Sequence, residues 1–370
     1  MNAPNPIVAL EAWLLRLPLE RPYRLVFGPV EALDTVLVRV TLDSGTSGWG
    51  EATLLTGYTD ETVEDTWSKV KALVAAGLDP LARTLDALDV SHPFLTTAFR
   101  SAEEMARRSP LLAVGASEAA PVRVPILGLL QGESERGIAA AAEQLLAEGY
   151  ATVKLKVGFD VARDAGNVVA AQRALAGRAQ LRLDANQGFD AASAAAFVAR
   201  VDPSGIELFE QPCAAGDWDA HLRVAHVAGE RGLPLMLDES IYSLREIERA
   251  AELRAARFIK VKLMKFNSLV KLAAAIDRIR ELGMTPVLGN GVASELSCWM
   301  EACVAARRVD NAGEMNGFLK PRDRLFAQPL RFRDGAIELI SDEAPLIDIE
   351  RLAHLSLAHV ACAPKRRALV

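Results

Sequence analysis

The sequence predicts an α/β protein in which an α+β module precedes a (β/α)₈ TIM barrel. From about residue 121, strand-like cores recur every 24–29 residues, and most intervals contain an Ala-rich amphipathic stretch, such as 191–201 or 244–255. One strand, one helix and two short loops need about that length. Eight such units favour the barrel over the alternative, a doubly wound parallel sheet. The expected strands begin near Val124, Val153, Leu181, Ile206, Leu235, Ile259, Pro286 and Ala312.

The segments on either side of this repeat have a different pattern. Residues 36–41 predict a strand, 43–48 a turn and 49–51 the start of the next strand, whereas the apolar spacing over 61–106 is mostly helical. Residues from about 336 onward break the repeat, and we expect them to return to the first module. These patterns divide the chain into 1–120, 121–335 and 336–370.

Composition excludes several classes of protein. The net charge is −6 and the chain has no long basic run, which argues against a nucleic-acid surface. No apolar run approaches the roughly 20 residues that span a bilayer, and the start, Met-Asn-Ala-Pro-Asn-Pro, lacks the basic region of a signal peptide. The four cysteines have no Cys-x-x-Cys spacing, as expected of free thiols. We therefore expect a cytoplasmic protein whose partner is a small molecule, without nucleic acid or membrane.

Two lysines, Lys154 and Lys156, stand one residue apart in the apolar stretch Thr-Val-Lys-Leu-Lys-Val-Gly. Side chains alternate along a strand, so both ammonium groups point to the face opposite the apolar residues. A single lysine at a strand end is usually solvated. Two on the buried face of one strand are costly unless anions balance them or chemistry uses them.

Three later strands end in carboxylates, which are Asp184 in Leu-Asp-Ala-Asn, Glu210 in Phe-Glu-Gln-Pro and Asp238 in Leu-Asp-Glu-Ser. Active sites of such barrels lie at the C-terminal strand ends, so we expect these three to converge. Any one alone could instead cap a helix. Three hard oxygen ligands without nearby Cys or His suit Mg²⁺, with Mn²⁺ as the alternative.

The sixth expected strand, 258–265, adds further cations. Lys260 and Lys262 share one face, and Lys262 would flank the metal from the side opposite Lys156, which makes these two an acid–base pair for an α-proton. Lys265 falls on the other face past the strand end and is interpreted as structural.

Residues near the ligands are assigned supporting roles. Arg182 lies one layer below Asp184, so an ion pair beneath the ligands is expected. Glu207 and Glu239 point away from the ligand face, where they support the ligands, and Asn186 is predicted to act in the same way.

Taken in order, the motifs Lys-Leu-Lys-Val-Gly, Leu-Asp-Ala-Asn-Gln-Gly, Phe-Glu-Gln-Pro, Leu-Asp-Glu-Ser and Lys-Leu-Met-Lys resemble the enolase superfamily, in its muconate lactonizing enzyme subgroup. The resemblance covers most of the chain, because the N-terminal module and the returning C-terminus fit that family's capping domain. It implies a modified barrel, Mg²⁺ on Asp184, Glu210 and Asp238, and acid/base roles for Lys156 and Lys262. Lys154 would lie beside the substrate carboxylate. A homo-oligomer, a dimer or an octamer, is implied as well.

The resemblance also names the regions that read the substrate. Two loops of the cap correspond to 19–28 and 52–58, and the candidate contacts there are Arg24, Phe27 and Tyr58. The seventh strand ends in Gly-Asn-Gly (289–291), where the mandelate racemase subgroup has a catalytic histidine. The resemblance therefore disfavours that subgroup.

The eighth strand end contributes two more candidate contacts, Glu314 and Asn316, in Gly-Glu-Met-Asn-Gly. Dipeptide epimerases of this family typically carry Asp-x-Asp there to hold an ammonium group. One carboxylate and one amide therefore disfavour a free dipeptide and leave an amino acid derivative. An acidic residue here also resembles cycloisomerase patterns.

Three functions follow from these patterns. The first is a metal-dependent racemase or epimerase that takes the α-proton of an amino acid derivative through an enediolate. The second is a muconate-type cycloisomerase or a β-eliminating lyase, a dehydratase or synthase, that shares this intermediate. The third is a non-catalytic barrel that binds a metal and a carboxylate.

Overall fold

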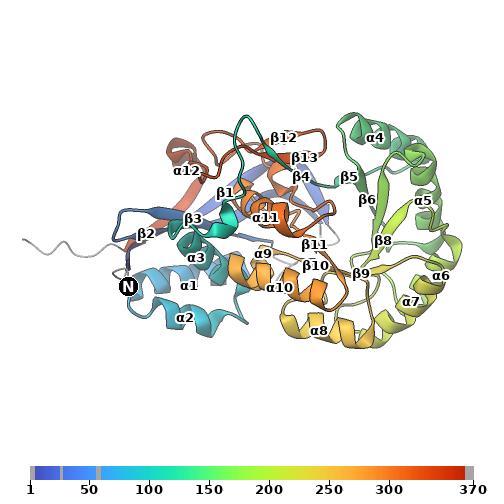
Figure 1. Cartoon of the computed structure of the whole chain (residues 1–370), viewed down its shortest axis with the longest axis horizontal. Coiled ribbons are helices and arrows are strands. Elements are labelled where there is room, and N and C mark those ends of the chain that lie inside the picture. Colours follow the sequence, from blue (N-terminus) through green and yellow to red (C-terminus); the bar gives the residue numbers. More distant parts are fainter. Residues whose placement is uncertain (1–4, 26–27, 56–59, 363–370) are drawn as a thin grey trace, which may run out of the picture.

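The computed structural model describes residues 5–25, 28–55 and 60–362, without the side chains of 23–25 and 28. A four-stranded antiparallel sheet with helices lies beside a curled seven-stranded parallel sheet that helices surround (Figure 1). The predicted fold class is thereby confirmed. No helix in these residues is both long and apolar enough to cross a bilayer.

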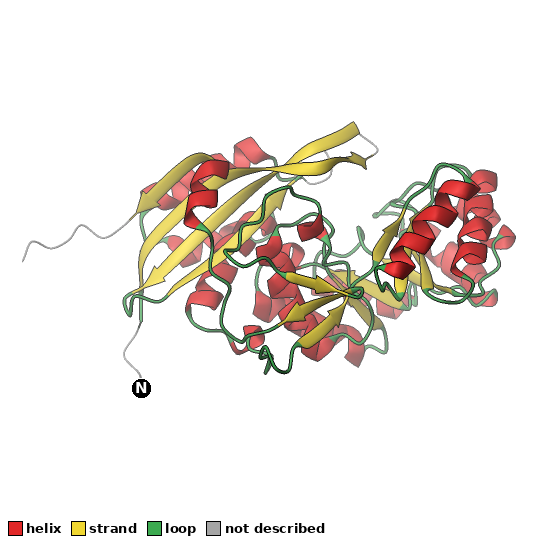
Figure 2. Cartoon of the chain, turned by 90° about the horizontal axis from the view of Figure 1, so that it is seen from above, coloured by secondary structure: helices red, strands yellow, loops and turns green. Residues whose placement is uncertain are grey.

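The N-terminal sheet has the strand order β14-β1-β2-β3, and its long strands run side by side next to the barrel (Figure 2). The helix α3 (Pro93–Ala106) packs against β3, where a Cβ on Gly50 would lie 2.1 Å from the Ala98 carbonyl oxygen. Only glycine permits this approach. The other elements are β1 (Ile7–Leu25), β2 (Gly28–Leu42), β3 (Ser47–Leu54), α1 (Val63–Ala76), α2 (Leu81–Leu88) and the 3₁₀ turn η1 (Pro110–Leu112).

In the segment 19–28, expected as a loop, the described residues 19–25 and Gly28 belong to strands. Strands β1 and β2 pair antiparallel as far as Leu25 and Gly28. The second expected loop, 52–58, begins inside β3, and only its part up to residue 55 lies within the described residues.

The barrel sheet is parallel throughout, and its strand order β11-β10-β9-β8-β7-β6-β5 is that of successive β/α units. Its strands are short, mostly apolar and almost completely buried. This is expected where helices cover the outer face of a parallel sheet and side chains fill the inner face. The strands are β5 (Gly128–Leu130), β6 (Thr152–Lys156), β7 (Gln180–Asp184), β8 (Ile206–Glu210), β9 (Leu235–Leu237), β10 (Phe258–Val261) and β11 (Thr285–Leu288).

Two of the eight expected strands differ from the prediction. The residues around Val124 form β4 (Val122–Pro125), which pairs antiparallel with β13 (Ala336–Leu339) outside the ring. Near Ala312 a single bridge replaces a strand: Gly313 pairs with Ile126, and the Glu314 N–H donates to the Leu288 carbonyl at 3.0 Å. The chain then turns into η2 (Gly317–Leu319), so the eighth position closes the ring without a ladder.

The barrel helices begin at side chains that cap them. Ser or Asp precedes each of seven helices and accepts a backbone N–H of the first turn, which satisfies a donor that the helix itself leaves unpaired. The helices are α4 (Glu135–Ala147), α5 (Val161–Leu175), α6 (Ala191–Arg200), α7 (Trp218–Glu230), α8 (Leu244–Leu253), α10 (Leu269–Glu281) and α11 (Glu295–Arg308), with α9 (Leu263–Phe266) as a single extra turn.

The C-terminal segment is divided between the two parts of the molecule. Strand β14 (Ser356–Cys362) pairs with β1, as expected of a chain that returns to the first module. Strands β12 (Arg331–Arg333) and β13 instead form a small sheet with β4, and α12 (Ile349–Leu355) precedes β14. The boundaries at 120 and 335 stay a proposal.

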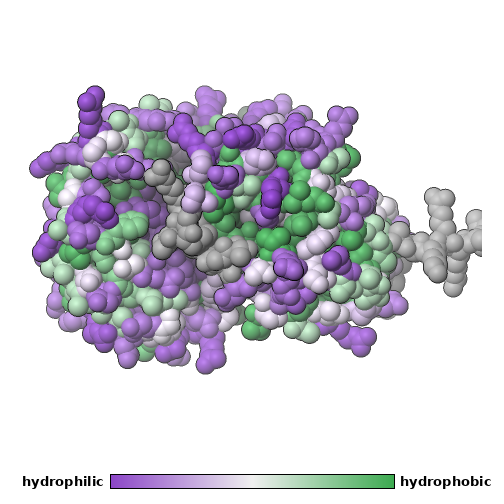
Figure 3. Space-filling view, turned by 180° about the vertical axis from the view of Figure 1, so that it is seen from behind, coloured by the Kyte–Doolittle hydropathy of each residue, from purple (hydrophilic) through white to green (hydrophobic). Residues whose placement is uncertain are grey.

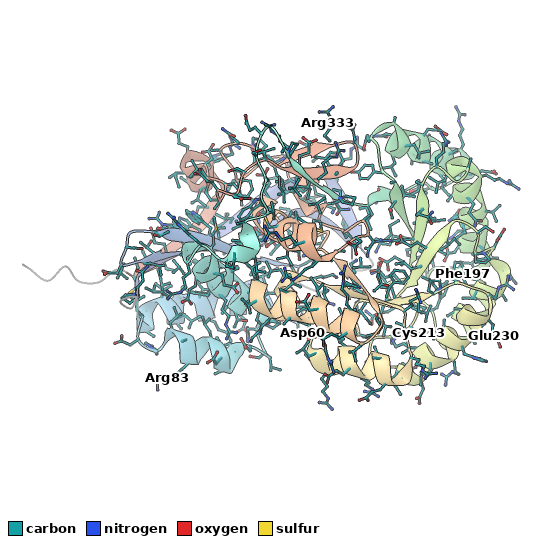
Figure 4. The ribbon with its side chains drawn as sticks, in the orientation of Figure 1. Asp60, Arg83, Phe197, Cys213, Glu230 and Arg333 are labelled. Carbon is teal, nitrogen blue, oxygen red and sulfur yellow. The ribbon has the colours of Figure 1, made fainter. Side chains whose placement is uncertain are left out.

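The core and the surface have the usual distribution of side chains. Phe197 on α6 is fully buried, with its ring centroid 5.3 Å from that of Phe209 on β8, whereas Arg83, Glu230 and Arg333 lie on the outer edges (Figure 4). Seen from behind, hydrophilic residues dominate the periphery and hydrophobic residues gather nearer the middle (Figure 3).

Candidate active site

Three carboxylates stand in a row at the C-terminal ends of neighbouring strands. Asp184 ends β7, Glu210 ends β8 and Asp238 follows β9 directly. Asp184 and Glu210 are partners in the parallel register. All three are at most 1% exposed. Parallel register brings the ends of successive strands to one edge, so the spacing seen in the sequence becomes a cluster in space.

Two lysines stand at the ends of this row. Lys156 on β6 places its Nζ 2.7 Å from Asp184 Oδ2, and Lys262, the residue after β10, places its Nζ 2.8 Å from Asp238 Oδ2. Around the ring the order is therefore Lys156, three carboxylates, Lys262. The Lys156 side chain is 36% exposed and that of Lys262 is 7% exposed.

A second layer of charge lies deeper in the barrel. Lys154 Nζ lies 2.6 Å from Glu314 Oε1, 2.9 Å from Asp184 Oδ2 and 3.6 Å from Glu210 Oε2. Lys260 Nζ lies 2.9 Å from Glu210 Oε1, 3.7 Å from Asp238 Oδ2 and in contact with Glu314. The ammonium groups of Lys154 and Lys260 therefore lie among four carboxylates. These are Asp184, Glu210, Asp238 and Glu314.

Burial and neighbouring charges oppose each other in setting the pKa values of this layer. Burial disfavours the charge on Lys154, but Asp184, Glu210 and Glu314 outweigh it and raise its pKa. Asp184 is also buried, yet Lys154 and Lys156 bring its pKa well below the usual value. Glu210 differs, because burial and the adjacent Asp184 raise its pKa to about 7. The row therefore holds carboxylates of different acidity.

The supporting residues lie next to the site. Asn186, at φ 41°, accepts a hydrogen bond from Lys156 and donates from Nδ2 to Glu239 Oε1 at 3.0 Å. Arg182 makes the ion pair expected beneath the ligands, with Nε 2.7 Å from Glu207 Oε2.

Several residues at the site were not assigned there from the sequence. Lys265 is one, because the expected strand ends at Val261 and α9 turns its side chain back, so that Nζ lies 2.9 Å from Asp238 Oδ1. Its interpretation as structural was based on strand alternation, which does not apply in a helix. Lys260 had a signal in the sequence, because alternation along the strand places it on the same face as Lys262. Glu301 had no signal in the sequence: it is buried on α11 and accepts the Leu263 N–H at 2.8 Å.

The predicted substrate contacts have different outcomes. Arg24 lies in β1, but its side chain is not described, and Phe27 and Tyr58 lie outside the described residues. Glu314 is buried between Lys154 and Lys260. Asn316 is also buried, with Nδ2 donating to the Leu127 carbonyl at 3.2 Å.

The site surrounds a small cavity of about 30 Å³. Its lining combines the carboxylate row, the lysines and the loop after β11: Leu55, Lys154, Lys156, Asp184, Asn186, Asp238, Lys260, Lys262, Asn290, Gly291, Val292 and Glu314.

The donor set of this site fits a hard divalent cation in its chemistry. It offers three buried carboxylates, and Glu210 Oε2 accepts no hydrogen bond from the described residues. The ligands are not gathered on one point, however. Within the described ranges, no three acidic, histidine or cysteine side chains form a group able to hold a metal, and the ammonium groups of Lys154 and Lys260 lie between the carboxylates.

Comparison with known proteins gives a consistent picture. Residues 137–345 match the family described as "Enolase C-terminal domain-like". The N-succinyl-L-Arg/Lys racemase of Bacillus cereus is 26% identical over 85% of this chain and 88% of its own. The aromatic dipeptide epimerase of Herpetosiphon aurantiacus is 32% identical, covering 82% and 87%. Muconate cycloisomerase 1 of Rhodococcus opacus is 28% identical, covering 93% and 95%.

Solved structures agree on the fold. The crystal structure of the muconate lactonizing enzyme from Pseudomonas fluorescens complexed with muconolactone superposes with a TM-score of 0.83. Its sequence is 23% identical, and the match covers 95% of this chain and 99% of that one.

Proposed function

We propose a function from the premise that this chain belongs to the enolase superfamily, in its muconate lactonizing enzyme subgroup: it is an isomerase that takes the α-proton of a small carboxylate. The substrate that we infer is an amino acid derivative, which makes the enzyme a racemase or epimerase. The main observation in support of this function is that Lys156 and Lys262 lie at opposite ends of the carboxylate row.

Inversion at an α-carbon needs one group that takes the proton and another that returns a proton to the opposite face. Lys156 and Lys262 fill these two roles. The neutral lysine accepts the α-proton, and the protonated one donates to the other face, so the pair holds the same number of protons before and after turnover. Lys154, whose pKa the surrounding carboxylates raise, stays positive and favours the charge that develops on the substrate carboxylate.

The proposed cofactor is Mg²⁺, with Mn²⁺ as the alternative, and its ligands are Asp184, Glu210 and Asp238. When bound, the ion would supply positive charge beside the enediolate oxygens. The buried oxygen donors support this assignment, and so does Glu210 Oε2, which accepts no hydrogen bond from the described residues. Asn186 and Glu239 hold Lys156 in place.

A second candidate is a cycloisomerase or β-eliminating lyase with the same intermediate. The similarity to muconate cycloisomerase 1 over 93% of this chain favours it. Such an enzyme needs the proton relay on only one face of the substrate, so the two candidates differ in their stereochemistry. Arg24, Phe27 and Tyr58 stay predicted substrate contacts under either function.

Proton exchange in deuterium oxide tests the proposal. The protein is incubated with Mg²⁺ and a panel of N-acylated amino acids, each as separate enantiomers, and the α-proton signal is followed by NMR. Exchange from both enantiomers is expected. Exchange from one enantiomer, with elimination or cyclisation, favours the second candidate. Tight binding without exchange from any carboxylate would contradict both and restore the non-catalytic barrel.

A further inference from the structure

The two lysines at the ends of the carboxylate row differ in what holds their backbone. Lys156 is the last residue of β6 and pairs in parallel register with Asp184, so the sheet fixes its position. Lys262 comes after the end of β10, which is Val261, and begins the turn α9 with an extended backbone, at φ −137° and ψ 140°. In the described part of the chain, the pairing of β10 with its neighbours stops before Lys262. The direction of the Lys262 side chain therefore depends on where α9 lies.

The turn α9 is too short to fix its own position. It has four residues, and Lys262 precedes it without a side-chain hydrogen bond that would cap it. A single turn makes few hydrogen bonds of its own and leaves its first N–H groups for outside partners. The first of these N–H groups belongs to Leu263, which is 1% exposed, so bulk water does not reach it. A protein acceptor is needed there.

Glu301 on α11 supplies this acceptor, with Oε1 2.8 Å from the Leu263 nitrogen. Its side chain is buried, and the neighbouring residues Met300 and Ala302 are apolar and buried as well. Burial raises the pKa of Glu301 to about 7, although the Leu263 amide and the charge of Lys262 oppose that change. A buried carboxyl among apolar side chains is costly. The hydrogen bond to α9 gives Glu301 a role that an apolar residue could not fill.

The position of α9 matters because two lysines at this turn contact one carboxylate. Lys262 Nζ lies 2.8 Å from Asp238 Oδ2, and Lys265 Nζ lies 2.9 Å from Asp238 Oδ1. A shift of α9 would move both ammonium groups relative to Asp238. Misplacing a catalytic group by about 1 Å can cost about a hundredfold in rate. Proton transfer by Lys262 therefore requires that α9 be held in place.

Other contacts of α9 join it to both parts of the molecule. Leu263 packs in the apolar core of the barrel, whereas Met264 packs in that of the N-terminal part. Thr97 on α3 donates to the Leu263 carbonyl at 3.4 Å, and Asn290 Nδ2 donates to Met264 Sδ at 3.2 Å. The first is a long hydrogen bond and the second has a weak sulfur acceptor. Both are weaker supports of the turn than the 2.8 Å hydrogen bond to Glu301.

We propose that Glu301 is a positioning residue for proton transfer by Lys262: its carboxyl oxygen holds the first N–H of α9 and thereby sets where Lys262 Nζ lies beside the substrate. This inference rests on the proposed function, in which Lys262 serves one face of the α-carbon. Lys156 does not depend on α9, because β6 holds it. Loss of Glu301 should therefore impair one of the two faces, whereas loss of a merely structural residue would impair both alike.

The test follows the exchange of the α-proton with retention of configuration, separately for the two enantiomers of an N-acylated amino acid, by NMR in deuterium oxide at saturating Mg²⁺. Lys262→Ala identifies the enantiomer whose exchange depends on Lys262. In Glu301→Met, kcat for that enantiomer should fall about tenfold or more, while its KM and both constants of the other enantiomer stay within about threefold of wild type. Racemisation should slow equally in both directions, because two enantiomers have equal free energy.

Two further variants separate the position of the acceptor from its charge. Glu301→Gln keeps an acceptor for the Leu263 N–H and should retain most of the exchange from both enantiomers. Glu301→Asp keeps the charge on a side chain that is one methylene shorter. It should show a weaker form of the same one-sided loss, and it covers the case in which Glu301→Met does not fold.

The matched controls are the same substitutions at Glu295. This residue is buried on the same helix and accepts the Phe326 N–H at 3.0 Å, in the C-terminal segment. Its variants should lower stability without changing the ratio of the two exchange rates. Hydrogen–deuterium exchange of the peptide 258–268, followed by mass spectrometry, gives a readout that is independent of activity. Its amides should exchange faster in Glu301→Met than in Glu301→Gln or in the Glu295 variants.

The outcomes separate this inference from the proposed function. An equal loss from both enantiomers, a ratio that no Glu301 variant changes, or a loss in Glu301→Gln as large as in Glu301→Met would overturn the role of Glu301 and leave the isomerase in place. Exchange from one enantiomer alone that survives in Lys262→Ala would remove Lys262 from the chemistry, and this inference with it. If that single exchange depends on Lys262, a larger loss in Glu301→Met than in Glu295→Met supports the inference, and equal losses overturn it. Exchange from no compound would overturn the proposed function as well.

Discussion

Two lysines on one strand meet different surroundings in this barrel. Lys154 is 2% exposed and is shared by three carboxylates, whereas Lys156, one residue later on the same face, bonds to Asp184 and Asn186 near the mouth. Two residues of strand advance the chain by about 6.6 Å. That distance separates a lysine surrounded by anions from one able to meet a substrate, which is why we assign proton transfer to Lys156.

Replacing the two proton-transfer lysines one at a time should give opposite stereochemical defects. Lys156→Ala is expected to abolish α-proton exchange from one enantiomer and Lys262→Ala from the other, because each serves one face. Losses of about a hundredfold or more are expected for removal of a general base. NMR in deuterium oxide measures the exchange, and calorimetry with Mn²⁺ checks that the metal still binds. Exchange of both enantiomers by Lys156→Ala would show that the assignment is wrong.

Glu301 gives a prediction for the pH dependence of stability. Burial raises its pKa from 4.5 to about 7, against the backbone amide of Leu263 and the charge of Lys262. A carboxyl whose pKa is higher in the folded state binds more protons there, so its contribution is present below pH 4.5 and is lost as the pH rises through 7.

Glu301→Gln keeps an acceptor for the Leu263 N–H and removes this titration. Relative to this variant, the free energy of unfolding of the wild-type protein should fall by roughly 3 kcal/mol at most between these two pH values. Denaturant unfolding of both proteins at several pH values measures the difference. Parallel stability profiles would contradict the assignment of a raised pKa to Glu301.

At the scale of elements, carboxylates of the N-terminal part hold helices of the barrel. Glu51 on β3 accepts the Ser294 N–H at 2.9 Å and the Ser297 N–H at 3.2 Å, at the start of α11. Glu104 on α3 accepts the Leu269 N–H at 2.7 Å at the start of α10. Each carboxylate satisfies donors that a helix leaves unpaired, and it lies where the helix dipole is positive. These contacts fix the position of the N-terminal part relative to the barrel strand ends that carry the site.

Removing one of these contacts should destabilise the junction. Glu51→Ala leaves buried N–H groups of α11 without acceptors and is expected to lower the free energy of unfolding by about 1–3 kcal/mol. Urea denaturation followed by circular dichroism measures the loss. Glu51→Gln, which keeps an acceptor oxygen, serves as the control and should lose less. If the two variants were equally stable, the contact with α11 would not be what Glu51 contributes.

At the scale of the whole molecule, the proposed metal should act as a stabilising ligand of the folded state. Its ligands come from three strands, so they are together only when the barrel is folded. At a hundred times the dissociation constant, a ligand of this kind stabilises by about 2.7 kcal/mol. Mg²⁺ should therefore raise the midpoint of thermal unfolding over that in EDTA, measured by calorimetry.

The variant that tests this prediction keeps the shape of a metal ligand and removes its charge, and the control makes the same change at an exposed site. Asp238→Asn should lose most of the Mg²⁺-dependent increase, whereas Asp310→Asn, at an exposed site far along the chain from the row, should keep it. An equal increase in both variants would place the ion elsewhere. The oligomer implied by the resemblance, a dimer or an octamer, stays a prediction that analytical ultracentrifugation of the same samples can check.

The regular part of the fold was predictable because its signals are local. Unit length and apolar runs located six of the parallel strands, and alternation placed Lys154, Lys156 and Arg182 on one face. The prediction failed where a strand pairs with a distant segment, as β4 does with β13, and where a turn interrupts the pattern, as at Gly313 and at α9.

The sequence by itself determined the barrel, the carboxylate row and the two lysines that flank it, since parallel register aligns strand ends whatever the loops do. Only the tertiary structure decided that Lys260 and Lys154 share Glu314, that α9 returns Lys265 to Asp238, and that Lys320 reaches Gly291. These contacts join side chains on loops and on distant strands. Their positions depend on how the whole chain packs, which local periodicity does not encode.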